Sequence, residues 1–295
     1  MLALAGRVAV EARRVAGGQR RALSETAARG ARAAQPALRD VQVSAQGPGV
    51  ALVLLDRPAR LNALSLEMGR ALCGLEALLP AGTRAVVVAG AGGKAFSTGR
   101  DLKDSKAHSA AEAAQYMALA RDSVLAVRAL GLPTVGALNG FAFGWGLELA
   151  LACDLRVASR DAVLCFPETS LGIFPGALGT VLLPRLVGAS VAKDLILTAR
   201  RFSGSEAFEL GVANRVAASA DECVAVALKL AATIGGNAPL GVRGARAVID
   251  QGLDMDFEGH VRLSDAHRLP LNDTEDFREA LLAFEQKRPP RFQGK

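Results

Sequence analysis

Short apolar runs recur along the first half of the chain, separated by longer segments in which apolar and polar residues mix. Four of these runs are largely apolar and have the length of buried strands: Val50–Leu55, Ala85–Ala89, Thr134–Leu138 and Leu155–Ala158. Their regular recurrence indicates strands that share a buried sheet, with other elements between them.

The segments between these runs carry helical patterns. Residues 66–79 place three leucines on one helical face: Leu72, Leu75 and Leu79. Ser109 and Glu112 have the spacing of a capping box, which predicts a helix that begins there and runs to about Leu130. Strands and helices therefore alternate through this part of the chain.

The chain after Gly176 is mostly helical in pattern. Ser203 and Glu206 repeat the Ser-x-x-Glu spacing of a helix start. Alternating strands and helices followed by helices alone predict an α/β core with a helical C-terminal part. The sequence shows no internal repeat clear enough to define the core further.

Composition and charge narrow the classes of function. The 295 residues can bury a substantial core in one large domain or two unequal ones. The net charge of +6 comes from residues 1–39, which hold eight arginines and two glutamates, whereas the rest has 27 basic and 27 acidic residues. A neutral body provides no basic field to attract nucleic acid. The Arg-rich, acid-poor head favours a mitochondrial transit peptide, with a disordered tail as the alternative.

Several kinds of site are disfavoured. No apolar run reaches the roughly eighteen residues of a membrane span. The glycines of residues 140–146 and 172–179 lack the spacings of dinucleotide and phosphate loops. A Ser-His-Asp hydrolase would have to bring one of three distant histidines into the site. The four scattered cysteines predict neither a metal site nor a disulfide framework, and favour a reduced compartment: Cys73, Cys153, Cys165 and Cys223.

Two glutamates stand out because each lies in a glycine-punctuated, otherwise apolar segment. Glu148 lies in residues 139–154, and Glu168 follows twenty residues later in residues 166–180. A carboxylate buried alone is costly unless it finds partners or its pKa rises. Two such groups in neighbouring tight loops are suited to general acid and base chemistry near neutral pH. Each glutamate alone would more commonly be a partnered structural carboxylate.

A third segment upstream favours a catalytic over a structural role for the two glutamates. Gly92–Lys103 follows a buried strand, and its glycines allow the backbone to approach a ligand closely. Together with Leu55–Leu64, the two glutamate segments and Ala283–Arg288, it resembles the crotonase (enoyl-CoA hydratase/isomerase) family over roughly residues 45–290. The combined match is specific for the family and much less so for the reaction.

The resemblance implies a fold and an assembly. The expected core is a spiral of ββα units over residues 40–235 that carries an acyl-CoA site, followed by a helical trimerisation region over residues 236–295. The chain is then expected to form a homotrimer or a dimer of trimers. The expected ligand is an acyl-CoA thioester, so coenzyme A belongs to the substrate and no separate cofactor or metal is expected.

The resemblance also implies roles for individual residues. Glu148 and Glu168 are the expected catalytic pair, and the backbone N–H groups of Arg100 and Trp145 are the expected oxyanion-hole donors. A helix expected to begin near Leu147 would reinforce the second donor with its positive end. Seven residues are expected to contact the substrate or CoA: Arg60, Arg100, Asp101, Leu102, Lys103, Phe284 and Lys287. The last two would lie in a short C-terminal helix and reach the CoA of a neighbouring subunit.

Two positions depart from the family pattern. Trp145, the only tryptophan, stands where hydratases usually have the third glycine of a Gly-Gly-Gly run. Its ring either packs into the core or limits the acyl pocket. Arg100 replaces a small residue, and its guanidinium either faces CoA phosphates or a polar acyl group, or lies in solvent.

Three functions fit these residues. Retention of both glutamates favours an enoyl-CoA hydratase, in which they hold a water that adds to C3 while Glu168 supplies a proton at C2. A double-bond isomerase would need only one base. A catalytically silent or RNA-binding relative is disfavoured by the intact glutamate pair and the neutral body of the chain.

Overall fold

The computed structural model describes residues 40–101 and 109–295. The Arg-rich head, Leu102 and Lys103 lie outside the described residues. Six strands form the larger sheet in the order β1-β2-β3-β5-β7-β10. The pair β1–β2 is antiparallel and the other neighbours are parallel. Their bounds are Val41–Ala45, Val50–Leu55, Ala85–Gly90, Thr134–Leu138, Leu155–Ser159 and Arg215–Ala217.

A smaller sheet runs beside the first in the order β4-β6-β8-β9. Its strands are short and comprise Ala95–Ser97, Phe141–Phe143, Val163–Cys165 and Phe202–Ser203. Strands of only two or three residues carry too little periodicity to be found from sequence. Each of β4, β6 and β8 directly follows a strand of the larger sheet along the chain.

This order produces the ββα units that the resemblance implies. The strand pair β3 and β4 leads into α5 (Ala110–Ala129), β5 and β6 lead into α6 (Trp145–Ala152), and β7 and β8 lead through η2 (Pro167–Leu171) into α7 (Gly179–Leu197). The two sheets therefore each gain one strand, parallel to the strand before it, as the chain passes from one ββα unit to the next. The segments that carry the two glutamates consequently follow neighbouring strands of the smaller sheet.

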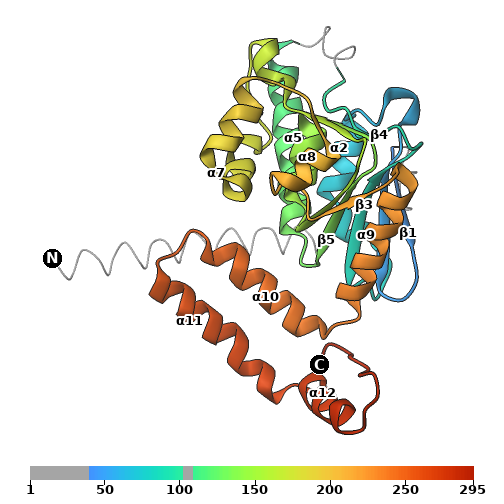
Figure 1. Cartoon of the computed structure of the whole chain (residues 1–295), viewed down its shortest axis with the longest axis vertical. Helices are drawn as coiled ribbons and strands as arrows, with labels where there is room; N and C mark the ends of the chain where they lie inside the picture. Colours follow the sequence, from blue (N-terminus) through green and yellow to red (C-terminus); the bar gives the residue numbers. More distant parts are fainter. Residues whose placement is uncertain (1–39, 102–108) are drawn as a thin grey trace, which may run out of the picture. The chain divides into compact units, whose positions relative to one another are not determined.

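Helices pack against the larger sheet, and the apolar strands supply most of the core cluster beneath α9 (Ala220–Gly235). Helix α9 packs its small buried side chains against the apolar strands, and Figure 1 shows it along the sheet. Helix α5 contacts both α6 and α2 (Leu66–Cys73). The capping box at Ser109 is confirmed, because its hydroxyl accepts from the Glu112 N–H and Glu112 reaches back to the Ser109 N–H.

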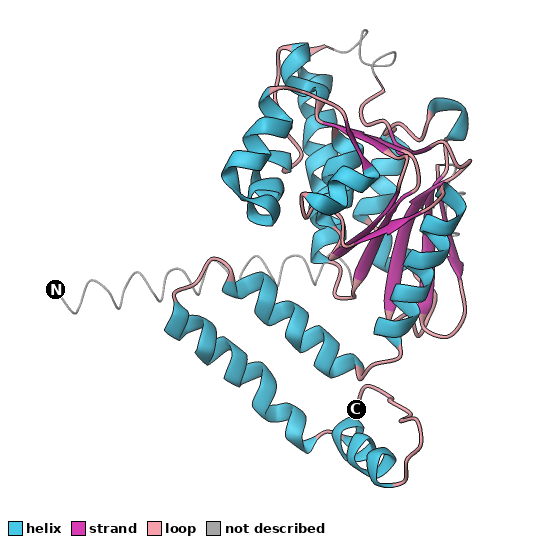
Figure 2. Cartoon of the chain, in the orientation of Figure 1, coloured by secondary structure: helices cyan, strands magenta, loops and turns pink. Residues whose placement is uncertain are grey.

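Three further helices follow α9: α10 (Pro239–Gly252), α11 (Phe257–Arg268) and, after the short turn η3 (Leu269–Asp273), α12 (Glu275–Glu285). Residues 239–295 contain helices and loops but no strand (Figure 2). Among the described residues, no single helix has both the length and the apolarity to cross a membrane; α9 and α10 meet these criteria only as a pair bent by 107°. The domain boundary expected near residue 235 stays a prediction.

Some expected elements differ from those observed. Gly74 divides the helix expected over residues 66–79 into α2 and α3 (Leu75–Leu78), because it caps the end of the first and the start of the second. Two short strands, β9 and β10, interrupt the region expected to be mostly helical. The C-terminal helix ends at Glu285, so its expected extension through Lys287 is wrong; Lys287 has a φ of 52°, which an α-helix does not allow.

Candidate active site

The two glutamates converge at the start of α6. Glu148 lies in the first turn of α6, where its backbone N–H donates to the carbonyl of the capping residue Gly144. A methyl group at Gly144 would lie 2.5 Å from Oε1 of Glu168, so the Glu168 carboxyl packs directly against this cap. Gly144 has a φ of 49°, and both its conformation and its closeness to Glu168 require glycine. The segments therefore share one site.

Glu148 is a buried carboxyl held by backbone donors. Its side chain is 2% exposed, and its Oε1 accepts from the N–H of Gly179 at 2.6 Å. Burial raises the pKa of Glu148 to about 7, the N–H groups of Gly179 and Ala177 oppose that rise, and the charge of Glu168 adds to it. Glu148 can therefore exchange a proton near neutral pH.

The turn that supplies these donors is strained. Leu178 has a φ of 83°, a left-handed conformation that a residue with a side chain rarely adopts. This conformation leads directly into α7, whose first residue is Gly179. The positive end of α7 thus faces the Glu148 carboxylate. The role of Gly179 was missed at the sequence level, although a glycine at the start of a helical pattern was visible there.

Glu168 lies in a different environment. It belongs to the five-residue turn η2, and burial raises the pKa of its carboxyl. Its Oε2 atom is buried and has no hydrogen-bond partner within residues 40–101 and 109–295. The backbone N–H of Glu168 itself opposes this rise in pKa, but it does not satisfy Oε2. Both carboxyls therefore have raised pKa values, and Glu148 is the one held by an N–H group of another segment.

The two expected oxyanion donors lie on neighbouring backbone segments. A methyl group at Gly99 would lie 2.6 Å from the carbonyl oxygen of Phe143 and 3.3 Å from the nitrogen of Trp145. The Gly99 carbonyl accepts from the Leu64 N–H at 2.8 Å, so in the same trans peptide the Arg100 N–H points away from Leu64. Trp145 is the first residue of α6, where an N–H has no acceptor within its own helix.

The Trp145 side chain is anchored in the core. Its ring is 4% exposed, and its Nε1–H donates to the Ala120 carbonyl at 3.0 Å and to the Ser123 hydroxyl at 3.2 Å. The helix expected near Leu147 begins two residues earlier, at Trp145 itself. The indole therefore occupies the space between α6 and α5.

The residues expected to contact CoA fall into separate groups. The Asp101 side chain is 7% exposed and lies 3.7 Å from Arg57 and 4.0 Å from Arg60, so it is part of an ion-pair cluster. Arg60 is 46% exposed. The Arg100 guanidinium lies 4.9 Å from the centre of the Tyr116 ring. Leu102 and Lys103 lie outside the described residues.

The two C-terminal candidates are exposed. Phe284 is 87% exposed near the end of α12, and Lys287 is exposed just beyond it. Figure 1 shows α12 well apart from α7, which begins beside Glu148. The fold of one chain therefore does not bring these two residues to the glutamates.

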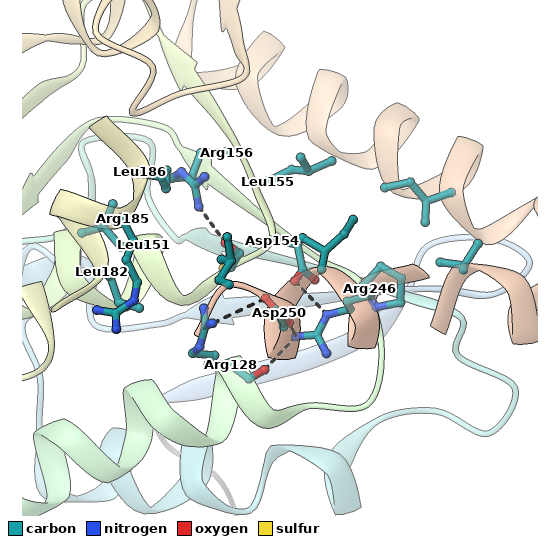
Figure 3. A pocket seen from close by; sticks show the side chains of 16 residues that line it. Arg128, Leu151, Asp154, Leu155, Arg156, Leu182, Arg185, Leu186, Arg246 and Asp250 are labelled. Carbon is teal, nitrogen blue, oxygen red and sulfur yellow. Dashed lines mark hydrogen bonds and ion pairs between the residues drawn. The ribbon is translucent and has the colours of Figure 1, made fainter. Parts of the chain in front are cut away.

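A separate cavity lies between the core and helix α10. It has a volume of about 510 Å³ and is lined by residues of α5, α6, α7, β7, α9 and α10 (Figure 3). In this cavity Arg246 lies 2.7 Å from Asp154 and 3.8 Å from Asp250, which also pairs with Arg128. These pairs connect α10 to the core. Neither Glu148 nor Glu168 lines this cavity.

Within the described ranges, no group of three or more His, Cys, Asp or Glu side chains is arranged to hold a metal ion. What the fold brings together here is two carboxyls and, beside them, the backbone segments of Gly99–Arg100 and Trp145. Such a site can stabilise negative charge on a carbonyl oxygen while protons move at neighbouring carbons.

Comparison with known proteins gives a consistent result. The family model described as enoyl-CoA hydratase/isomerase matches residues 45–295. The chain is 39% identical over 267 residues to the mitochondrial enoyl-CoA hydratase domain-containing protein 2 of Bos taurus, covering 87% of this chain and 89% of that protein. It is 37% identical over 262 residues to the enoyl-CoA isomerase/hydratase fer4 of Mycosarcoma maydis. This alignment covers 85% of this chain and 95% of that protein.

The fold agrees as well. The structure of an enoyl-CoA hydratase from Bacillus anthracis superposes with a TM-score of 0.84 at 36% identity, covering 87% of this chain and all of that one. The expected crotonase-like fold is therefore confirmed.

Proposed function

The chain belongs to the enoyl-CoA hydratase/isomerase family, and we propose that it adds water across the 2,3 double bond of an enoyl-CoA thioester. The observation that carries this proposal is the convergence of two carboxyls, the buried Glu148 and the half-buried Glu168, at the Gly144 cap of α6. Hydration needs one group that takes a proton from water and another that gives a proton to carbon. The different surroundings of the two carboxyls fit this division.

In the proposed reaction, a water held between the carboxyls forms a bond to C3 of the substrate. Glu148, as a carboxylate, takes a proton from this water. The electrons of the double bond move toward the thioester oxygen, and Glu168 then delivers its proton to C2. The proton on Glu148 must return to Glu168 before the next turnover.

The negative charge that develops on the thioester oxygen requires donors. The N–H groups of Arg100 and Trp145 are the proposed pair, with the positive end of α6 behind the second. Each such donor in a dry site contributes roughly 3 kcal/mol to transition-state stability. Support comes from the close approach of Gly99 to the nitrogen of Trp145.

Isomerisation is the second candidate, because the fer4 relative is named as an isomerase/hydratase. An isomerase would use a single carboxyl to move a proton between C2 and C4.

The experiment that separates the two reactions follows the enone absorbance of short-, medium- and branched-chain 2-enoyl-CoA with purified protein, with a 3-enoyl-CoA in parallel. Loss of the 2-enoyl band supports hydration. Appearance of that band from the 3-enoyl substrate, without later loss, would support isomerisation instead.

Assembly is proposed from the exposed apolar side chains of the C-terminal helices. Six are more than half exposed: Ile249, Leu253, Phe257, Leu269, Leu281 and Phe284. Large apolar side chains exposed in this number on one set of helices favour a protein interface. We infer a homotrimer or a dimer of trimers in which Phe284 and Lys287 reach the CoA of a neighbouring subunit.

This assembly can be tested by light scattering of the full chain and of a variant truncated after Asp273. The truncation should lower both the assembled mass and the acyl-CoA affinity. A full-length protein with the mass of one chain and full activity would refute the shared site.

A mitochondrial location is proposed from the Arg-rich head and from the mitochondrial relatives of similar sequence. Import of a reporter fused to residues 1–39 tests it.

A further inference from the structure

One face of helix α5 runs past both backbone donors of the proposed oxyanion hole. Tyr116, Ala120 and Ser123 are spaced by four and three residues, so they lie on the same side of this helix. Tyr116 and Ser123 are buried, with exposures of 5% and 0%. Tyr116 bonds to the backbone beside the Arg100 donor, and Ala120 and Ser123 bond to the side chain of Trp145, the residue that carries the other donor.

Tyr116 holds the segment that carries the first donor. Its hydroxyl donates to the Leu64 carbonyl at 3.0 Å and accepts from the backbone N–H of Asp101. The N–H of Leu64 in turn donates to Gly99, in the same peptide as the Arg100 N–H. The hydroxyl thus bridges two chain segments on either side of this donor. Burial raises the Tyr116 pKa, so the hydroxyl keeps its proton at neutral pH.

Ala120 and Ser123 hold the residue that carries the second donor. The Trp145 Nε1–H is shared between the Ala120 carbonyl and the Ser123 hydroxyl, and that hydroxyl donates to the same carbonyl at 2.7 Å. The indole and the backbone N–H belong to one residue. A shift of the ring therefore turns the first turn of α6 and moves its N–H.

Helix α5 fixes the spacing of these anchors. Tyr116 and Ser123 are seven residues apart, which is roughly 10 Å along an α-helix. Because α5 is a continuous helix of 20 residues, this spacing cannot change without breaking its hydrogen bonds. An oxyanion hole needs both donors within about 3 Å of one oxygen, so a displacement below an ångström at either end weakens one bond.

We propose that Tyr116 and Ser123 are positioning residues that, through helix α5, set the separation of the Arg100 and Trp145 N–H donors. This proposal rests on the proposed acyl-CoA function, since it needs a thioester oxygen between the two donors. It also assigns a use to Trp145, the residue at which this chain departs from the family pattern: the indole couples α6 to the same helix that holds the other donor.

The test removes single hydroxyl groups: Tyr116→Phe and Ser123→Ala, with Val127→Ala as the matched control. Val127 is fully buried on α5, one turn beyond Ser123, and its side chain carries no hydrogen-bonding group. The readout is the infrared band of the thioester carbonyl of a saturated acyl-CoA, isotope-labelled at that carbon and bound to each protein. A saturated chain cannot be hydrated, so polarisation is measured without turnover.

Wild type should shift the carbonyl band to lower frequency than in free acyl-CoA. Tyr116→Phe and Ser123→Ala should each lose a large part of that shift and lower kcat by about 10-fold with little change in KM. Val127→Ala should lower the melting temperature and keep the full shift. If one hydroxyl variant fails to fold, the other still decides.

A full shift in both hydroxyl variants would overturn the positioning role while leaving the proposed function intact. Equal losses in Val127→Ala would also overturn it, because any weakening of α5 would then suffice. An unshifted band in wild type would instead refute the oxyanion hole itself, and the positioning role with it.

Discussion

The segments around Glu148 and Glu168 contain the same residue type in opposite surroundings. All eight residues of α6 are buried, and Glu148 accepts hydrogen bonds from the backbone at the start of α7. In η2 no residue is fully buried, Leu171 is 55% exposed, and one oxygen of Glu168 is buried without a hydrogen-bond partner among the described residues. Helix α6 therefore holds a buried carboxyl that a backbone donor fixes in place, whereas η2 carries a half-buried carboxyl whose Oε2 receives no donor from the described residues.

The largest expected effect is the loss of folding stability when the Trp145 side chain is removed from α6. Trp145→Gly removes a buried aromatic side chain and both of its hydrogen bonds to α5, so it should cost about 3–5 kcal/mol in the free energy of unfolding. Chemical denaturation measures this cost.

Some activity should remain in Trp145→Gly, because glycine still supplies a backbone N–H. If the indole also limits the acyl pocket, the variant should accept longer or branched acyl chains. Unchanged stability together with an unchanged chain-length preference would show that neither role is correct.

The next effect tests the division between the carboxyls. Glu148→Gln and Glu168→Gln should each lower kcat by about 10²-fold or more, as expected for positioned acid and base groups, which is about 2.7 kcal/mol or more. Acyl-CoA binding, measured by calorimetry, should survive in both, since neither residue is assigned to CoA.

The two variants also discriminate between reactions. A large loss in Glu168→Gln alone would favour isomerisation, which needs one carboxyl. Near-normal turnover in both would end the catalytic assignment of the pair.

A smaller effect concerns stability and pH. The folded pKa of Glu148, about 7, lies above its unfolded value, so the folded state binds more protons between roughly pH 4.5 and 7. Stability should therefore fall as pH rises through this window. Glu148→Gln removes the buried charge, so it should be more stable than wild type at pH 8 by about 1–3 kcal/mol, with the difference shrinking toward pH 4.5.

Urea denaturation at these two pH values measures this difference. Glu168→Gln serves as the comparison. Because Glu168 lies in a half-buried turn, its replacement should raise the free energy of unfolding at pH 8 by less. A Glu148→Gln variant that is less stable than wild type at pH 8 would show that the backbone donors outweigh burial.

The parts of the fold that the sequence predicts are those set by local chemistry. Val50–Leu55 and Thr134–Leu138 have the predicted bounds, because a short apolar run must be buried from end to end. The helix at Ser109 begins where its capping box predicts. Strands β4, β6 and β8 escaped prediction because three residues show no period, and the repeated ββα units depend on them.

The site residues also fall into two groups, those that the sequence identifies and those that it does not. Glu148 and Glu168 were identifiable as polar residues within apolar, glycine-rich segments, and the resemblance supplied their roles. Gly179 and Tyr116 were not, because they act on residues 31 and 52 positions away. Lys287 was misplaced because a periodic pattern does not show where a helix ends.

The most direct test of the central claim is the mass of the product formed from a short 2-enoyl-CoA in oxygen-labelled water. The two-carboxyl account predicts a product heavier by one labelled water in wild type, and a rate at least about 10²-fold lower in both Glu148→Gln and Glu168→Gln. A wild-type product with the mass of the substrate, or labelled product formed at an undiminished rate by both variants, would contradict it.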